Sequence, residues 1–92
     1  MPPLSTEEVQ GRLIGLPDWQ IEAGELAKTY AFKDFLQALA FVNKVGEFAE
    51  TAGHHPDIDI RYNRVRLSLV THDAGGLTDK DFDLAHQVET LG

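Results

Sequence analysis

The chain has 92 residues and no cysteine, and its 15 acidic and 8 basic side chains give a formal net charge of −7 with neutral histidines. This length predicts a single domain over residues 1–92, and the lack of cysteine excludes disulfides and thiolate metal sites. The acidic balance argues against direct nucleic-acid binding, which needs a basic surface. No targeting segment is visible and no apolar run approaches the roughly 20 residues of a membrane span, so we expect a cytoplasmic protein that does not bind membranes.

The N-terminal part of the chain predicts a short helix followed by a β-hairpin. A capping box begins at Ser5, ahead of apolar residues at helical spacing. Residues 19–23 alternate between apolar and polar side chains, as a strand does, and Gly24–Glu25 fits the centre of a type II′ turn. Residues 26–32 predict the return strand, in which Lys28 interrupts the apolar face and indicates an edge position or a bulge.

The rest of the chain predicts a long helix, a second hairpin and a last helix. Residues 34–52 carry a wide apolar stripe at three- and four-residue spacing. Residues 57–62 and 65–70 alternate on either side of Asn63, which marks a turn, and Thr78 caps the last helix. The order α-β-β-α-β-β-α predicts an α+β fold, with one four-stranded antiparallel sheet and three helices on one face.

Three of the four histidines cluster around the second hairpin. His54 and His55 precede its first strand, where Pro56 favours an extended backbone for His55, and His72 ends its second strand. His54 and His72 each lie 9 residues from Asn63, so pairing of the two strands would bring the imidazoles to one end of the sheet. Because imidazole gives and takes protons near neutral pH, this arrangement predicts an acid–base site.

The surroundings of these histidines leave three interpretations open. Carboxylates that could assist acid–base chemistry lie in the flanking loops and helix starts, at Glu50, Asp57, Asp73 and Asp81. Without a cysteine or a serine in a nucleophile-elbow motif, proton transfer or elimination is favoured over acyl transfer. The histidines can instead be ordinary loop residues, or three imidazoles can hold zinc, although no HxH or HxxxH spacing is present.

Several short motifs follow one another along the second half of the chain. They are Ala49-Glu50, Gly53-His54-His55-Pro56, Tyr62-Asn63-Arg64-Val65, Thr71-His72-Asp73, Gly76-Leu77-Thr78-Asp79-Lys80-Asp81 and Leu84-Ala85. In this order and spacing the chain closely resembles the pterin-4a-carbinolamine dehydratase family. The resemblance continues upstream through Trp19 and Phe32-Lys33-Asp34-Phe35, so it covers nearly the whole chain.

This resemblance implies the fold predicted above and the dehydration of 4a-hydroxytetrahydropterin to quinonoid dihydropterin, with no metal or organic cofactor. The enzyme would be a 4a-hydroxytetrahydrobiopterin dehydratase, which recycles the pterin used by aromatic amino acid hydroxylases. We expect His54, His55 and His72 to be the catalytic residues, with His54 and His72 as general acid and base and His55 positioning the pterin and sharing in proton transfer. The expected substrate-binding residues are Glu50, Pro56, Thr71, Asp73 and Asp81, the last of which is also expected to orient a histidine.

One departure and one alternative accompany this resemblance. Family members often have tryptophan two residues after the proline of His-His-Pro, where this chain has Ile58, so one aromatic wall of the pterin pocket is expected to be missing. The resemblance also implies a homodimer or homotetramer. Because the family includes dimerisation partners of a homeodomain transcription factor, the alternative function is a protein-binding module with little or no catalysis.

Overall fold

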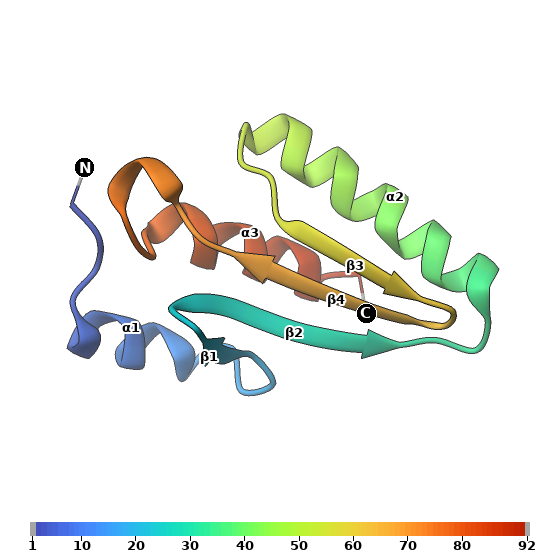
Figure 1. Ribbon diagram of the computed structural model, residues 1–92, viewed down its shortest axis with the longest axis horizontal. Helices are drawn as coiled ribbons and strands as arrows, with labels where there is room; N and C mark the ends of the chain where they lie inside the picture. The colour runs from blue at the N-terminus through green and yellow to red at the C-terminus, as the bar shows by residue number, and fades with distance from the viewer. Residues whose placement is uncertain (1, 92) are drawn as a thin grey trace.

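The computed structural model describes residues 2–91, which form one antiparallel sheet with three α-helices (Figure 1). The elements are α1 (Thr6–Leu13), β1 (Gln20–Glu22), β2 (Glu25–Ala31), α2 (Phe35–Ala52), β3 (Asp57–Arg61), β4 (Arg64–Leu69), the 3₁₀ turn η1 (His72–Ala74) and α3 (Asp79–Glu89). The four strands lie in the order β1-β2-β4-β3. The predicted fold class and element order are therefore confirmed. None of the helices within residues 2–91 is long and apolar enough to cross a membrane.

The hydrophobic core lies between the helices and one face of the sheet. Leu26 of β2 and Leu67 of β4 point into it and are at most 1% exposed. Side chains of all three helices belong to the same buried cluster, including Val9 of α1, Val45 of α2 and Leu84 of α3. The helices therefore cover one face of the sheet, as the sequence predicts.

The ends of α2 follow from its flanking residues. The Asp34 side chain accepts a hydrogen bond from the backbone N–H of Gln37 at 2.9 Å, which caps the start of the helix. At the other end Gly53 takes a φ of 63°, a left-handed conformation that glycine adopts without steric cost. The chain thus leaves α2 abruptly and passes into the connection to β3.

The first hairpin differs from the prediction at its turn and shows the surroundings of Lys28. Its turn is formed by Ala23 and Gly24, whose φ values of 51° and 79° are both positive. This is the pattern of a type I′ turn, so the predicted turn at Gly24–Glu25 is wrong by one residue. Lys28 does not lie in a bulge, because β2 pairs in unbroken register with β4. Strand β1 pairs only with the first three residues of β2, so within the described part of the chain the side of β2 away from β4 has no partner strand at Lys28. The Lys28 ammonium contacts the Glu89 carboxylate of α3 at 2.7 Å.

The second hairpin is shorter than predicted at two positions. Strand β3 ends at Arg61, because Tyr62 has a φ of 52° and forms the turn with Asn63. Strand β4 ends at Leu69, and His72 begins the η1 turn rather than ending the strand. His72 is thereby placed on a short loop beyond the end of the sheet.

Candidate active site

The three clustered histidines meet at one end of the sheet. His54 and His55 lie between α2 and β3, and His72 follows β4. They line a depression of about 260 Å³ together with Gly53, Val70, Thr71, Asp73 and Lys80. The antiparallel pairing of β3 with β4 brings these segments together, as the spacing about Asn63 predicts.

His54 is held on both its backbone and its ring. Its backbone N–H donates to the carbonyl of Ala49 at 3.1 Å, which is part of the left-handed ending of α2. Its side chain is only 12% exposed, and its ring Nε2 lies 2.5 Å from Oδ1 of Asp81. The orientation of this imidazole is therefore fixed by a residue 27 positions away in the sequence.

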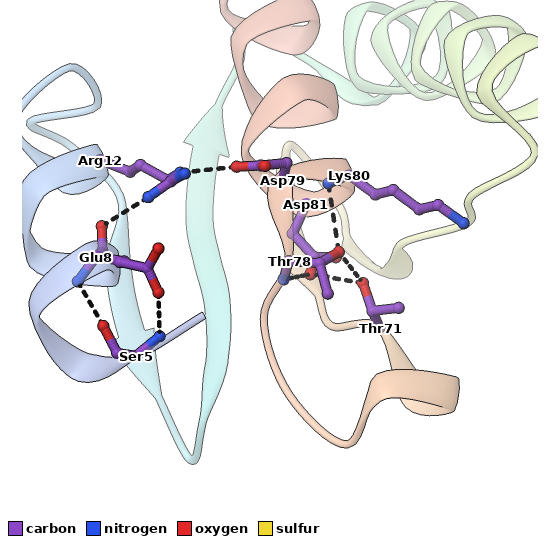
Figure 2. A network of polar contacts seen from close by, with 8 residues as sticks. All are labelled: Ser5, Glu8, Arg12, Thr71, Thr78, Asp79, Lys80 and Asp81. Carbon is purple, nitrogen blue, oxygen red and sulfur yellow. Dashed lines mark hydrogen bonds and ion pairs between the residues drawn. The ribbon is translucent and has the colours of Figure 1, made fainter. Parts of the chain in front are cut away.

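Asp81 is a buried acceptor at the start of α3. Its side chain is fully buried, and its Oδ2 accepts hydrogen bonds from the Thr71 hydroxyl at 2.8 Å and the Thr78 backbone N–H at 2.9 Å (Figure 2). Toward an ionised carboxylate, which only accepts hydrogen bonds, Nε2 of His54 is the donor. Such a partner fixes the tautomer of His54, and Nδ1 is the ring nitrogen that Asp81 does not contact.

Asp81 contacts a histidine, as the resemblance implies, and it also caps α3, a role that was not predicted. Thr78 and Asp81 form a second capping box, in which the Asp81 side chain accepts from the backbone N–H of Thr78. The spacing Thr-x-x-Asp is typical of such a capping box. The resemblance implies that Asp81 orients a histidine, and the structure identifies that histidine as His54.

The other two histidines are more exposed than His54. The His55 ring is 61% exposed, and its Nε2 contacts the Glu50 carboxylate, which is itself 78% exposed. His72 is exposed on η1, and no hydrogen bond joins its ring to another side chain within residues 2–91. The site therefore combines one anchored imidazole with two accessible ones.

The remaining predicted site residues fall into two groups. Thr71 and Asp73 line the depression, whereas Pro56, Glu50 and Asp81 are not part of its lining. Glu50 contacts a histidine that lines the depression, and Asp81 lies behind one. Among residues 2–91, no three His, Asp or Glu side chains are arranged to hold a metal ion, so the geometry does not support the zinc interpretation.

Lys80 is a lining residue that the sequence did not single out. It borders the histidine depression and a second one of about 320 Å³, which is also lined by His54. Its side chain extends away from Asp81 (Figure 2). Because Lys80 lies between two aspartates at the start of a helix, the sequence alone indicates only a solvated side chain.

Comparisons with known proteins agree with this architecture. The family model described as Pterin 4 alpha carbinolamine dehydratase matches residues 2–91. A protein of Acidobacterium capsulatum that carries the provisional name pterin-4-alpha-carbinolamine dehydratase is 60% identical over 91 residues, which cover 99% of each chain. A similarly named protein of Chloroflexus aurantiacus is 55% identical and covers 99% of this chain and 98% of the relative.

Two solved structures share the fold. A protein from Brucella melitensis described as a transcriptional coactivator/pterin dehydratase matches with a TM-score of 0.93 and 31% identity, covering 97% of each chain. A pterin dehydratase-like protein identified as a RuBisCO assembly factor in the alpha-carboxysome matches with a TM-score of 0.64 and 26% identity, over 79% of this chain and 84% of that one. Because the family model matches nearly its whole length, the chain belongs to the pterin 4 alpha carbinolamine dehydratase family.

Proposed function

We propose that this protein dehydrates 4a-hydroxytetrahydropterin to quinonoid dihydropterin by histidine acid–base catalysis. One observation carries the proposal beyond family membership. His54 is fixed by the buried Asp81 carboxylate at the wall of a depression that His55 and His72 also line. A fixed imidazole beside accessible ones suits a reaction that moves protons and needs no nucleophile.

The reaction removes water from adjacent atoms of the pterin ring. The C4a–O bond breaks as an imidazolium donates a proton to the departing oxygen, which leaves as water. The N5 lone pair forms the new double bond to C4a, and a neutral imidazole takes the proton from N5. One histidine thus loses a proton as another gains one, and exchange with water restores both.

His54 and His72 are the acid–base pair in this proposal. Because Nε2 of His54 donates to Asp81, proton exchange with the substrate falls to its Nδ1. His72 is exposed on η1 and is free to exchange its proton with solvent between turnovers. The pH–rate profiles of the single variants at His54 and His72 identify which of the two acts as the acid.

His55 and the remaining lining residues bind the pterin in this proposal. The contact between His55 and Glu50 restrains a ring that is otherwise exposed. Thr71 and Asp73 border the depression, and Pro56 fixes the backbone direction after the histidine pair. With Ile58 in place of a family tryptophan, we expect binding to depend more on these polar groups than on stacking.

The direct test is stopped-flow absorbance of 4a-hydroxytetrahydropterin breakdown, with a methyl or a biopterin side chain at C6. The parent protein should accelerate the decay, and His72→Ala should reduce kcat/KM by about 10²–10⁴-fold, the usual contribution of general acid–base catalysis. His86→Ala is the matched control, because His86 is an exposed histidine of α3 outside the depression that His72 lines. No acceleration by the parent, or full activity of His72→Ala on both C4a epimers, would refute the proposal.

A second candidate function is a protein-binding module. The solved relatives include proteins described as a transcriptional coactivator and as a RuBisCO assembly factor. This chain exposes large apolar side chains such as Leu36 of α2 and Tyr62 of the second turn, at 75% and 69%. Capture of a specific partner by a protein that does not turn over the pterin would favour this function over catalysis.

A further inference from the structure

The segment before α1 contacts the loop that joins the catalytic histidine of η1 to α3. The backbone N–H of Leu4 donates to the carbonyl of Leu77 at 2.7 Å. A Cβ atom built on Gly76 would lie 3.0 Å from Cβ of Pro3, closer than side chains normally approach. Glycine at position 76 therefore permits the N-terminal segment to lie directly on the loop.

The contacted peptide group also holds the buried aspartate. The carbonyl of Leu77 and the N–H of Thr78 belong to one planar peptide unit, so fixing one fixes the other. The carbonyl accepts from Leu4, while the N–H donates to Oδ2 of Asp81 at 2.9 Å. Because Oδ1 of Asp81 holds the ring of His54, an unbroken series of hydrogen bonds links the N-terminal segment to the candidate acid–base residue.

The same loop carries His72. Its ends are joined by the backbone hydrogen bond from Thr71 to the carbonyl of Gly76, at 3.2 Å, and η1 lies between them. Pro3 therefore contacts the base of the turn that bears the second imidazole.

A second contact ties α1 to the start of α3. Nε of Arg12 donates to Oδ1 of Asp79 at 2.8 Å across the two helices (Figure 2). Both side chains are more than a third exposed, so this ion pair adds little energy by itself. It does place α1 against the first turn of α3, where Asp81 begins its contacts.

From these contacts we infer that the N-terminal segment, residues 3–12, is a positioning element of the active site. It holds the peptide between Leu77 and Thr78, and through it Asp81 and His54, while Pro3 supports the turn that bears His72. The inference rests on the proposed dehydratase function for its activity readout. Its structural readout is independent of that function.

The test uses Gly76→Ala, which adds a single methyl group against Pro3. Gly76 does not have a positive φ, so the substitution probes the contact and leaves the backbone conformation accessible. We expect kcat to fall roughly tenfold with little change in KM, because displaced acid–base groups affect the chemical step more than binding. The ring NMR signals of His54 and His72 should shift, and the amide hydrogen of Thr78 should exchange faster.

Two further variants test whether the contact between residue 76 and Pro3 causes the loss of kcat. Pro3→Gly combined with Gly76→Ala removes the clashing atom, and should return kcat and the histidine signals close to those of the parent. Gly46→Ala on α2 is the matched control, since a Cβ there meets nothing within 4 Å. Unchanged kcat and histidine signals in Gly76→Ala, or a loss that Pro3→Gly does not restore, would overturn the inference. A parent protein without dehydratase activity would refute the proposed function, while the NMR comparison would still test the positioning element.

Discussion

At the scale of single residues, Asp81 determines the geometry of the site. Its two oxygens accept hydrogen bonds from His54, Thr71 and the Thr78 backbone in a fully buried position. The donors come from the connection between α2 and β3 and from both ends of the connection between β4 and α3. One carboxylate therefore closes the start of α3 and orients the imidazole.

Asp81→Asn keeps the size of the side chain but replaces one acceptor by a donor. The new amide must face at least one of the existing donors, and a buried unsatisfied group costs about 1–3 kcal/mol. We expect the free energy of unfolding to fall by that amount, as measured in urea. If His54 acts as proposed, kcat should also fall by about 10² or more.

The control for this variant is Asp83→Asn, because Asp83 is an exposed carboxylate on the same helix. An exposed substitution of this kind should change stability by less than about 0.5 kcal/mol. Equal stability losses in the two variants would contradict the structural role of Asp81.

Residue patterns predicted the histidine cluster, whereas the support from Asp81 was expected only from the family resemblance. The cluster of His54, His55 and His72 followed from strand alternation and the turn at Asn63, because hairpin register is a local property. The contact of His54 with Asp81 depends on where α3 packs across the end of β4. That placement is set by the whole core, so no spacing in the sequence reveals it.

At the scale of elements, the last turn of α3 is joined to β2 by a polar cluster. The Glu89 carboxylate accepts hydrogen bonds from the Lys28 ammonium, at 2.7 Å, and from the Tyr30 hydroxyl. The ammonium also lies 4.3 Å from the centre of the Tyr30 ring, a cation–π contact. Burial, followed by the adjacent Glu89 carboxylate, raises the pKa of Tyr30.

This cluster predicts acid-sensitive stability. Burial of Glu89 acts to raise the pKa of its carboxyl group, but the hydrogen bonds from Lys28 and Tyr30 outweigh it, so the pKa lies below the ordinary value of 4.5. A lowered folded-state pKa means that the stabilisation is complete above pH 4.5 and is lost as the pH falls through the folded-state pKa. Glu89→Gln should lower the free energy of unfolding at pH 7 by about 1–2 kcal/mol, allowing for partial exposure.

The decisive measurement is how the stability difference between the parent and Glu89→Gln changes with pH. In urea titrations the stability gap between parent and Glu89→Gln should shrink as the pH falls below 4.5. Glu47→Gln is the control, because Glu47 is an exposed residue of α2 paired only with Lys44 three positions away. A gap that stays constant with pH would show that Glu89 contributes packing and no ionic interaction.

The same cluster explains why one element was predicted incompletely. All three helices and all four strands follow from apolar periodicity and capping residues, which are local signals. Lys28 interrupts the apolar pattern of β2, and its partner could not be predicted because Glu89 is 61 residues away. The turn at Ala23–Gly24 was displaced by one residue because alanine rarely adopts the positive φ that it has there.

At the scale of the whole molecule, the sheet ends in an unpaired edge. Strand β3 is the outer strand beside β4, and all five of its residues are exposed. Ile58 and Ile60 are each more than a third exposed. Such an edge is a template for pairing with another strand, which supports the expected homo-oligomer.

The charges of β3 favour pairing with a second copy of itself. In an antiparallel arrangement centred on Ile60, Asp59 of each chain faces Arg61 of the other and Ile60 faces Ile60, whereas centring on Asp59 would place Asp59 against Asp59. A register centred on Ile58 would instead place Asp57 against Asp59 and is disfavoured by repulsion. We therefore predict a dimer formed through β3, seen as a particle of about twice 10.2 kDa in sedimentation experiments.

Arg61→Asp tests this edge, because it converts both favourable cross-strand pairs into like-charge pairs. Each of the two attractive pairs is worth about 0.2–1 kcal/mol and is replaced by a repulsion of similar size, so the change sums to about 0.8–4 kcal/mol. The dimer Kd should therefore rise roughly 4- to 800-fold. High salt should narrow the difference in Kd between the parent and Arg61→Asp, because these charges are exposed. Arg64→Asp is the matched control: it makes the same charge change on β4, one strand in from the edge. Equal weakening by both variants would attribute the effect to net charge, and an unchanged dimer in Arg61→Asp would place the interface elsewhere on the molecule.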